Sequence, residues 1–157
     1  MYPKTHFIIG LFFALFIFLI FPQIGIIGLS IIVLSTVLID VDHYIYYVYK
    51  KRDFNLKKAF QWFVDNGEKY LSFSDSKKKN VCFGICFLHG IELILVFFVL
   101  FYFFKFPFLL FVSTGFVFHQ FLDAIDLYKR NIHPNKVLSL TYSLIYARNK
   151  KLADEIE

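Results

Sequence analysis

Cysteine, proline and tryptophan are scarce in this chain: its 157 residues include 2 Cys, 4 Pro and 1 Trp. Two cysteines cannot make the disulfide framework that stabilises many small secreted domains. Because Cys82 and Cys86 lie four residues apart in an apolar stretch, we expect reduced thiols packed in a helix rather than a thiolate site completed by His89. The chain also has no internal repeat, no low-complexity linker and no room for a second core. We therefore expect one domain over residues 1–157.

Charged residues are also scarce, and apolar residues are abundant. Charged residues make up 18% of the chain and hydrophobic residues 58%, with 23 Phe, 10 Tyr and a mean hydropathy of +0.60. A soluble domain of this size has too small an interior to hide that many large apolar side chains. The composition therefore argues against an ordinary soluble protein and predicts that lipid is the solvent for much of the chain.

The apolar residues form four runs, which predict four transmembrane helices at about residues 7–21, 24–43, 81–104 and 106–127. The first run follows Lys4 as in a signal peptide, but no small-residue cleavage site follows it and the second run begins at once. Pro22 with Gln23, and Lys105 with Pro107, leave room only for tight turns. The predicted fold class is all-α: a multi-pass membrane helical bundle of four transmembrane helices plus a cytoplasmic amphipathic helix.

Residues 50–80 form the one long polar segment and predict a short amphipathic helix on the membrane surface. Apolar side chains recur there at helical spacing, at Leu56, Phe60, Phe63 and Val64. Asp53 or Asn55 can cap its start and Asn66–Gly67 can end it, which would place Trp62 at headgroup level. We favour a membrane anchor over a lid that covers a site.

Basic residues predict the orientation. Four spans place both termini and residues 50–80 on one face, and of the 17 Lys and Arg residues only Lys105 lies on the other. By the positive-inside rule the basic face is cytoplasmic. Anionic lipid headgroups then account for the net charge of +5, so the bilayer is the expected partner and nucleic acid is not. We expect a multi-pass protein of the cell membrane, with both termini and the tail 128–157 in the cytoplasm.

The ionisable side chains within the predicted spans all lie in the cytoplasmic half. They are His6, Asp40, Asp42, His43, His89, Glu92, His119, Asp123 and Asp126. On ideal helices His89 and Glu92 share one face, as do His119 and Asp123. Single groups of this kind are usually interfacial or form a buried polar staple, but each span contributes at least one, and this convergence favours a metal site.

Histidine and carboxylate groups on a bundle interior indicate zinc or a similar divalent ion, as one or two ions. The expected metal ligands are His6, Asp40, Asp42, His43, His89, His119 and Asp123. Paired ions suit phosphoester hydrolysis, with Glu92 or a non-ligating Asp, for which we name Asp42, as the catalytic base. A non-catalytic membrane protein with a structural polar or metal cluster is the alternative. A metal-ion transporter ranks lower, because the outer half of the spans lacks polar groups.

An ordered set of motifs resembles a known family, the YdjM-like predicted membrane-bound metal-dependent hydrolases. The set comprises His6 before the first span, the D-x-D-H run at Asp40–His43, His89, and the H-x-x-x-D pair His119 and Asp123. The resemblance covers roughly residues 1 to 127. Because that family is thought to be related to the helical zinc phospholipase C and nuclease fold, the resemblance implies a phospholipid or another phosphoester as substrate.

Overall fold

The fold is all-α, as predicted. The computed structural model describes residues 3–78, 81–82, 86–130, 139–147, 151–152 and 155. Its helices are α1 (Pro3–Ile20), η1 (Pro22–Ile24), α2 (Gly25–Leu38), α3 (Val41–Lys51), α4 (Leu56–Ser72), α5 (Asp75–Lys78), α6 (Ile91–Phe104), α7 (Pro107–Lys129) and α9 (Leu140–Ala147). Within these described residues, the one sheet is a parallel pair of two-residue strands, β1 (Val81–Cys82) and β2 (Lys151–Leu152). Much of the predicted tail 128–157 lies outside the described residues.

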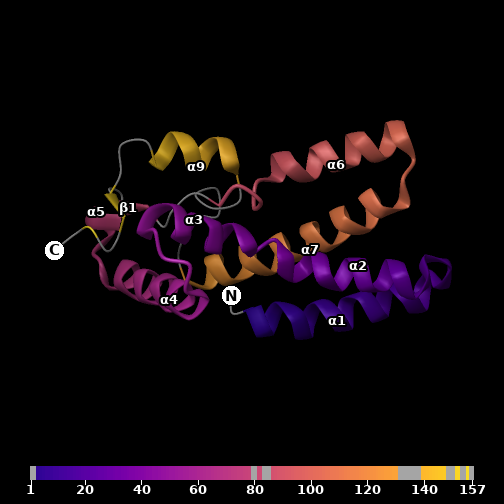
Figure 1. The fold of residues 1–157 in the computed structure, drawn as a ribbon, viewed down its shortest axis with the longest axis horizontal. Coiled ribbons are helices and arrows are strands. Elements are labelled where there is room, and N and C mark those ends of the chain that lie inside the picture. Colours follow the sequence, from indigo (N-terminus) through magenta and orange to yellow (C-terminus); the bar gives the residue numbers. More distant parts are fainter. Residues whose placement is uncertain are drawn as a thin grey trace.

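Two helical hairpins form the elongated part of the molecule (Figure 1). Between α1 and α2, Pro22 opens the 3₁₀ turn η1 and Gly25 takes a φ of 62°, which favours glycine. Between α6 and α7, Lys105 takes a φ of 56° and Pro107 opens α7. Both predicted turns are therefore confirmed. Figure 1 shows them at the same end of the molecule, away from α4, α5 and α9.

Helix α7 is central to the bundle, because it packs against both α2 and α6, while α2 packs against α1. Ala14, Ile32 and Val33 form a buried cluster between α1 and α2. A second cluster lies where α2, α6 and α7 meet, and it consists of Ile39, Ile94 and Phe116. These clusters fix the relative positions of the four long helices and hence of the polar side chains that they carry.

The second predicted span, residues 24–43, is interrupted by a turn. Helix α2 ends at Leu38, Ile39 and Asp40 form the turn, and α3 begins at Val41. The last carbonyl groups of a helix have no partner within it. One of them, the Thr36 carbonyl oxygen, is bonded by a histidine of α7 that is described below. The interruption thus exposes a backbone acceptor to the centre of the bundle.

The third predicted span, residues 81–104, contains a helix much shorter than expected. Helix α6 has 14 residues and begins only at Ile91, after an extended Gly90. Cys86 and His89 therefore precede the helix, and the predictions that His89 shares a helix face with Glu92 and that Cys86 lies in a helix are wrong.

Side chains from other helices hold this non-helical segment in place. The Leu88 N–H donates to a carboxylate oxygen of Asp42 at 2.8 Å, and the His89 carbonyl accepts from the Gln120 amide at 2.7 Å. These two bonds satisfy backbone groups that an α-helix would otherwise pair, so a buried loop is tolerated where the sequence pattern predicts a helix.

Helix α4 confirms the predicted amphipathic helix and one of its two predicted caps. The Asn55 side chain accepts a hydrogen bond from the Lys58 N–H at 3.0 Å, which is N-cap geometry. The predicted end at Asn66–Gly67 is wrong, because α4 continues to Ser72. The Asn66 side chain does not terminate the helix because it donates back to the Trp62 carbonyl at 2.8 Å. Helix α4 packs on α3.

Two helical stretches are long and apolar enough to cross a membrane. They are Pro22–Lys51, which includes the turn before α3, and Pro107–Lys129. Lys4–Ile20 and Ile91–Phe104 are apolar but shorter. A 14-residue helix such as α6 reaches about 21 Å, less than the ~30 Å of bilayer hydrocarbon. Among the described residues, two of the four predicted spans therefore have the length expected.

Candidate metal centre

The fold brings the seven predicted metal ligands into one continuous polar cluster in the bundle. They come from the start of α1 (His6), the α2–α3 turn (Asp40), the first turn of α3 (Asp42 and His43), the loop before α6 (His89) and α7 (His119 and Asp123). His6, Asp42, His89 and His119 are completely buried. Segments far apart in the sequence thus place titratable groups together in an otherwise apolar interior.

Four ligand atoms converge on one point. They are His89 Nε2, His119 Nε2, Asp40 Oδ1 and Asp123 Oδ2. Five of their separations are 3.0, 3.1, 3.4, 3.6 and 3.6 Å. An ion bound tetrahedrally at 2.0–2.1 Å needs its nitrogen and oxygen ligands about 3.3–3.4 Å apart. The four atoms therefore have the spacing of one tetrahedral coordination shell.

The other ring nitrogens fix which atoms carry lone pairs. His119 Nδ1 donates to the Thr36 carbonyl at 2.7 Å, and His89 Nδ1 donates to Asp42 Oδ2 at 3.0 Å. In the neutral rings both Nε2 atoms then carry lone pairs, and these face each other across 3.1 Å beside two carboxylates. Four electron-pair donors aimed at one point are positioned to hold a cation.

Unpartnered polar atoms surround the same point. Among the described residues, His6 Nδ1 and Nε2 and Asp40 Oδ2 are buried and have no hydrogen-bond partner. The His6 ring stacks on His119 with centroids 4.0 Å apart, and His6 Nε2 lies 3.2 Å from Asp123 Oδ1 without hydrogen-bond alignment. Buried polar atoms are rarely left unsatisfied, so their grouping here also fits a bound ion.

Asp42 contacts two imidazole rings and a backbone N–H. Its Oδ2 accepts from His89 Nδ1 and from the Leu88 N–H, and its Oδ1 lies 2.7 Å from His43 Nδ1. Both oxygens are thus already engaged by the protein. A carboxylate that holds the far nitrogen of a ligand histidine orients the ring and raises its basicity. We interpret Asp42 as this supporting group.

Two supporting residues were missed in the sequence. Gln120 holds the His89 carbonyl, and Thr36 supplies the carbonyl that orients His119. The role of Gln120 could have been suspected from the sequence, because Gln120 is a second polar residue directly after His119 in an apolar run. Thr36 had none, because it acts through a backbone atom.

Glu92 does not join the cluster. Its Oε1 accepts from the Ser139 hydroxyl at 2.8 Å and the Thr141 N–H at 3.1 Å, and its Oε2 accepts from the Leu140 N–H at 3.0 Å. The carboxylate therefore caps the start of α9. This contact indicates that Glu92 holds the C-terminal helix, and its role as the base stays a prediction.

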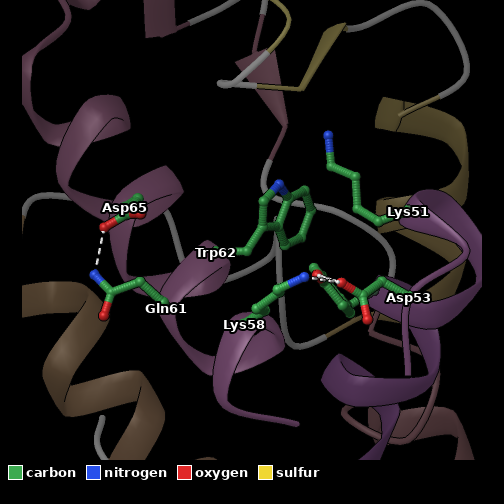
Figure 2. A pocket seen from close by; sticks show the side chains of 7 residues that line it. Lys51, Asp53, Lys58, Gln61, Trp62 and Asp65 are labelled. Atoms are coloured by element: carbon green, nitrogen blue, oxygen red, sulfur yellow. Dashed lines mark hydrogen bonds and ion pairs between the residues drawn. The ribbon is translucent and has the colours of Figure 1, made fainter. Parts of the chain in front are cut away.

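A separate surface cavity of about 310 Å³ lies between α3 and α4 (Figure 2). Its polar side chains pair with one another: Lys58 with Asp53 at 3.0 Å, and Gln61 with Asp65 at 2.7 Å. The Asn55 N–H and the Lys58 ammonium hold the pKa of Asp53 below its usual value. The Trp62 ring packs against Tyr47 on α3. The cavity thus belongs to the α3–α4 contact.

No protein family, no curated protein and no solved structure matches this chain. The function must therefore be inferred from the cluster itself. Its histidine and carboxylate donors suit a divalent ion, and the donor set alone does not identify the metal.

Proposed function

We propose that the protein is a membrane-embedded, metal-dependent hydrolase that acts on a phosphoester, such as that of a phospholipid, at the cytoplasmic face. The observation that carries the proposal is the convergence of His89, His119, Asp40 and Asp123 on one point inside an apolar bundle. Ionisable groups at such depth are costly unless they are paired or bind an ion.

The surface of the helices supports the membrane part of the proposal. Only 33% of the apolar window in Pro22–Lys51 and 39% of that in Pro107–Lys129 is buried inside the protein. Large apolar side chains therefore cover the outside of the bundle, for example Leu19 (77% exposed) and Ile27 (78% exposed). A soluble protein rarely exposes such a surface. With lipid as solvent, α1 would be a third span, and α6 together with the loop before it would be the fourth, because irregular backbone is tolerated where it is buried in protein.

Zinc is the ion that we favour, because two histidines and two carboxylates at tetrahedral spacing suit it. A bound divalent ion would polarise the phosphoester and lower the pKa of a water molecule. His89, His119, Asp40 and Asp123 would hold it, with Asp42 and the Thr36 carbonyl orienting the two rings. His6, whose Nε2 lies 3.2 Å from Asp123 Oδ1, and the second oxygen of Asp40 are further donors beside this centre, and they would serve a second ion.

Membership of the YdjM-like family is part of the proposal. The motifs that carry the resemblance, His6, Asp40–His43, His89, and His119 with Asp123, are the residues that the fold brings into the cluster. The metal-dependent hydrolysis that this family implies is the chemistry proposed here.

Metal content and hydrolysis in matched variants test the proposal. The full chain would be purified in detergent without chelators, its metals measured, and hydrolysis of bis(p-nitrophenyl) phosphate and of phospholipid in mixed micelles followed. We expect a bound divalent ion and loss of both metal and hydrolysis in His119→Ala and Asp123→Asn. Asp126→Asn is the control, because Asp126 lies on the same helix but pairs with Arg130 at 2.9 Å. Full metal content in both ligand variants would contradict the assignment.

One observation favours a second candidate, a structural metal site in a non-catalytic membrane protein. Four protein atoms fill a tetrahedral shell, as in structural zinc sites, whereas catalytic sites keep a position open. Metal bound at full stoichiometry, with no hydrolysis of either phosphoester, would support this candidate over the hydrolase.

A further inference from the structure

A second group of ligand atoms lies beside the first centre, on the other side of Asp42. Asp42, His43, Cys86 and His89 each offer an atom, and these atoms lie within 4.8 Å of one another. The Cys86 Sγ lies 3.7 Å from His43 Nε2. Asp42 Oδ1 lies 2.7 Å from His43 Nδ1, so that nitrogen donates to the carboxylate and Nε2 of the neutral ring presents its lone pair to the sulfur.

The arrangement repeats the pattern of the first centre, in which Asp42 holds the far nitrogen of a ligand histidine. A nitrogen at 2.0–2.1 Å and a thiolate sulfur at 2.3 Å from a tetrahedral ion lie about 3.5–3.6 Å apart. The observed 3.7 Å is close to this separation. Cys86 lies in the loop before α6 rather than on a helix, and from there its sulfur reaches the His43 ring.

Burial of the two groups differs in a way that suits an open ion site. Cys86 is 7% exposed, which shields the sulfur, whereas the His43 side chain is 30% exposed. His89 is already turned towards the first centre through Nε2, and both Asp42 oxygens are engaged. An ion here would therefore have two protein ligands, and its other positions would be open to water or an incoming ligand.

We infer that Cys86 Sγ and His43 Nε2 form a second, thiolate-containing site for a borderline or soft divalent ion such as zinc, separate from the His89–His119–Asp40–Asp123 centre. Binding there releases the Cys86 proton to solvent, because the thiolate is the ligand. Because this site has two protein ligands and the first centre has four, it binds an ion with lower affinity than the first centre. The inference does not depend on hydrolysis, since an ion can bind at Cys86 whether or not the first centre is catalytic.

Titration of the metal-free full chain in detergent with Co²⁺ tests the inference, because thiolate-bound cobalt has a charge-transfer band in the near ultraviolet that nitrogen and oxygen ligands do not give. We expect the tighter binding, at the first centre, without that band and a further, weaker equivalent with it. The band should be absent in Cys86→Ser and His43→Ala. It should persist in Cys82→Ser, the chain's other cysteine, and in His119→Ala, which removes a ligand of the first centre.

The wild-type spectrum decides the matter even if a variant fails to fold. Saturation with Co²⁺ without a thiolate band would show that Cys86 is only a hydrogen-bonded thiol, and the inference would fail while the proposed function stands. A thiolate band without any binding at the first centre would leave the Cys86 site intact and overturn the metal assignment of the proposed function.

Discussion

The buried carboxylates of the cluster differ in what each oxygen contacts. Asp40 and Asp123 each aim an oxygen at the four-atom centre, whereas Asp42 is engaged by two imidazole rings and a backbone N–H. We therefore predict that Asp42→Asn weakens zinc binding by about 10–100-fold, the usual effect of removing an orienting partner, while Asp123→Asn abolishes it. Competition with a chromogenic chelator measures both affinities. Asp65→Asn, which alters an exposed carboxylate, should leave the affinity unchanged, and an unchanged affinity in Asp42→Asn would refute the orienting role.

Glu92 gives a second prediction at this scale. In the wild type, backbone N–H groups donate to both carboxylate oxygens of Glu92. Glu92→Gln retains one acceptor oxygen but replaces the other with an amide N–H₂, so that one donor faces another donor. We expect wild-type metal content and hydrolysis in this variant, with faster proteolysis of the segment that contains α9. A catalytic base would behave in the opposite way, losing hydrolysis at unchanged protease resistance. Comparison of turnover with limited proteolysis separates the two roles.

The residues of the polar cluster could be identified from the sequence because ionisable side chains are rare in apolar runs. His119 and Asp123 also keep their predicted helical spacing within α7. The separate role of each residue in the cluster could not be predicted from the sequence. Whether a carboxylate faces an ion or supports a ring depends on a few tenths of an ångström between segments far apart in the chain. The Glu92 contact with residues 139–141 is equally non-local, so no local pattern could indicate it.

At the scale of the elements, close helix contact depends on small residues at particular positions. A Cβ added at Gly115 on α7 would lie 2.7 Å from the Ile32 backbone carbonyl and 2.5 Å from Ser35 Cβ on α2. We predict that Gly115→Ala destabilises the protein by about 1–3 kcal/mol, the usual cost of overpacking. Gly67→Ala is the control of opposite sign, because Gly67 lies inside α4 with open space around it and alanine favours helix by up to about 1 kcal/mol. Thermal unfolding in detergent tests both, and equal stability of the two variants would contradict the packing argument.

Helix ends were predicted correctly where turn residues bound an apolar run, as at Pro22 and at Lys105 with Pro107. The third run was misread because its apolar composition is the same for a membrane helix and for a buried loop. Residues 86–90 are held as a loop by two hydrogen bonds: the Leu88 N–H donates to Asp42, and the Gln120 amide donates to the His89 carbonyl. Both partners lie more than 30 positions away in sequence and on other helices. Periodicity cannot report such contacts.

At the scale of the whole molecule, the two hairpin turns lie at one end, away from α4, α5 and α9 (Figure 1). If the helices cross a bilayer, the turn at Pro22–Ile24 and α4 must face opposite sides, and the positive-inside rule then predicts that α4 faces the cytoplasm. We predict that a cysteine introduced by Gln23→Cys reacts with a membrane-impermeant maleimide in intact cells, whereas Lys57→Cys reacts only after permeabilisation. The native Cys86 is buried and gives little background, and both variants would also carry Cys82→Ser. The reverse pattern would invert the orientation and place the metal centre near the outer face. Labelling of both positions from the same side would instead remove the hairpin spans, and the exposed apolar surface would then need a protein partner rather than lipid to cover it.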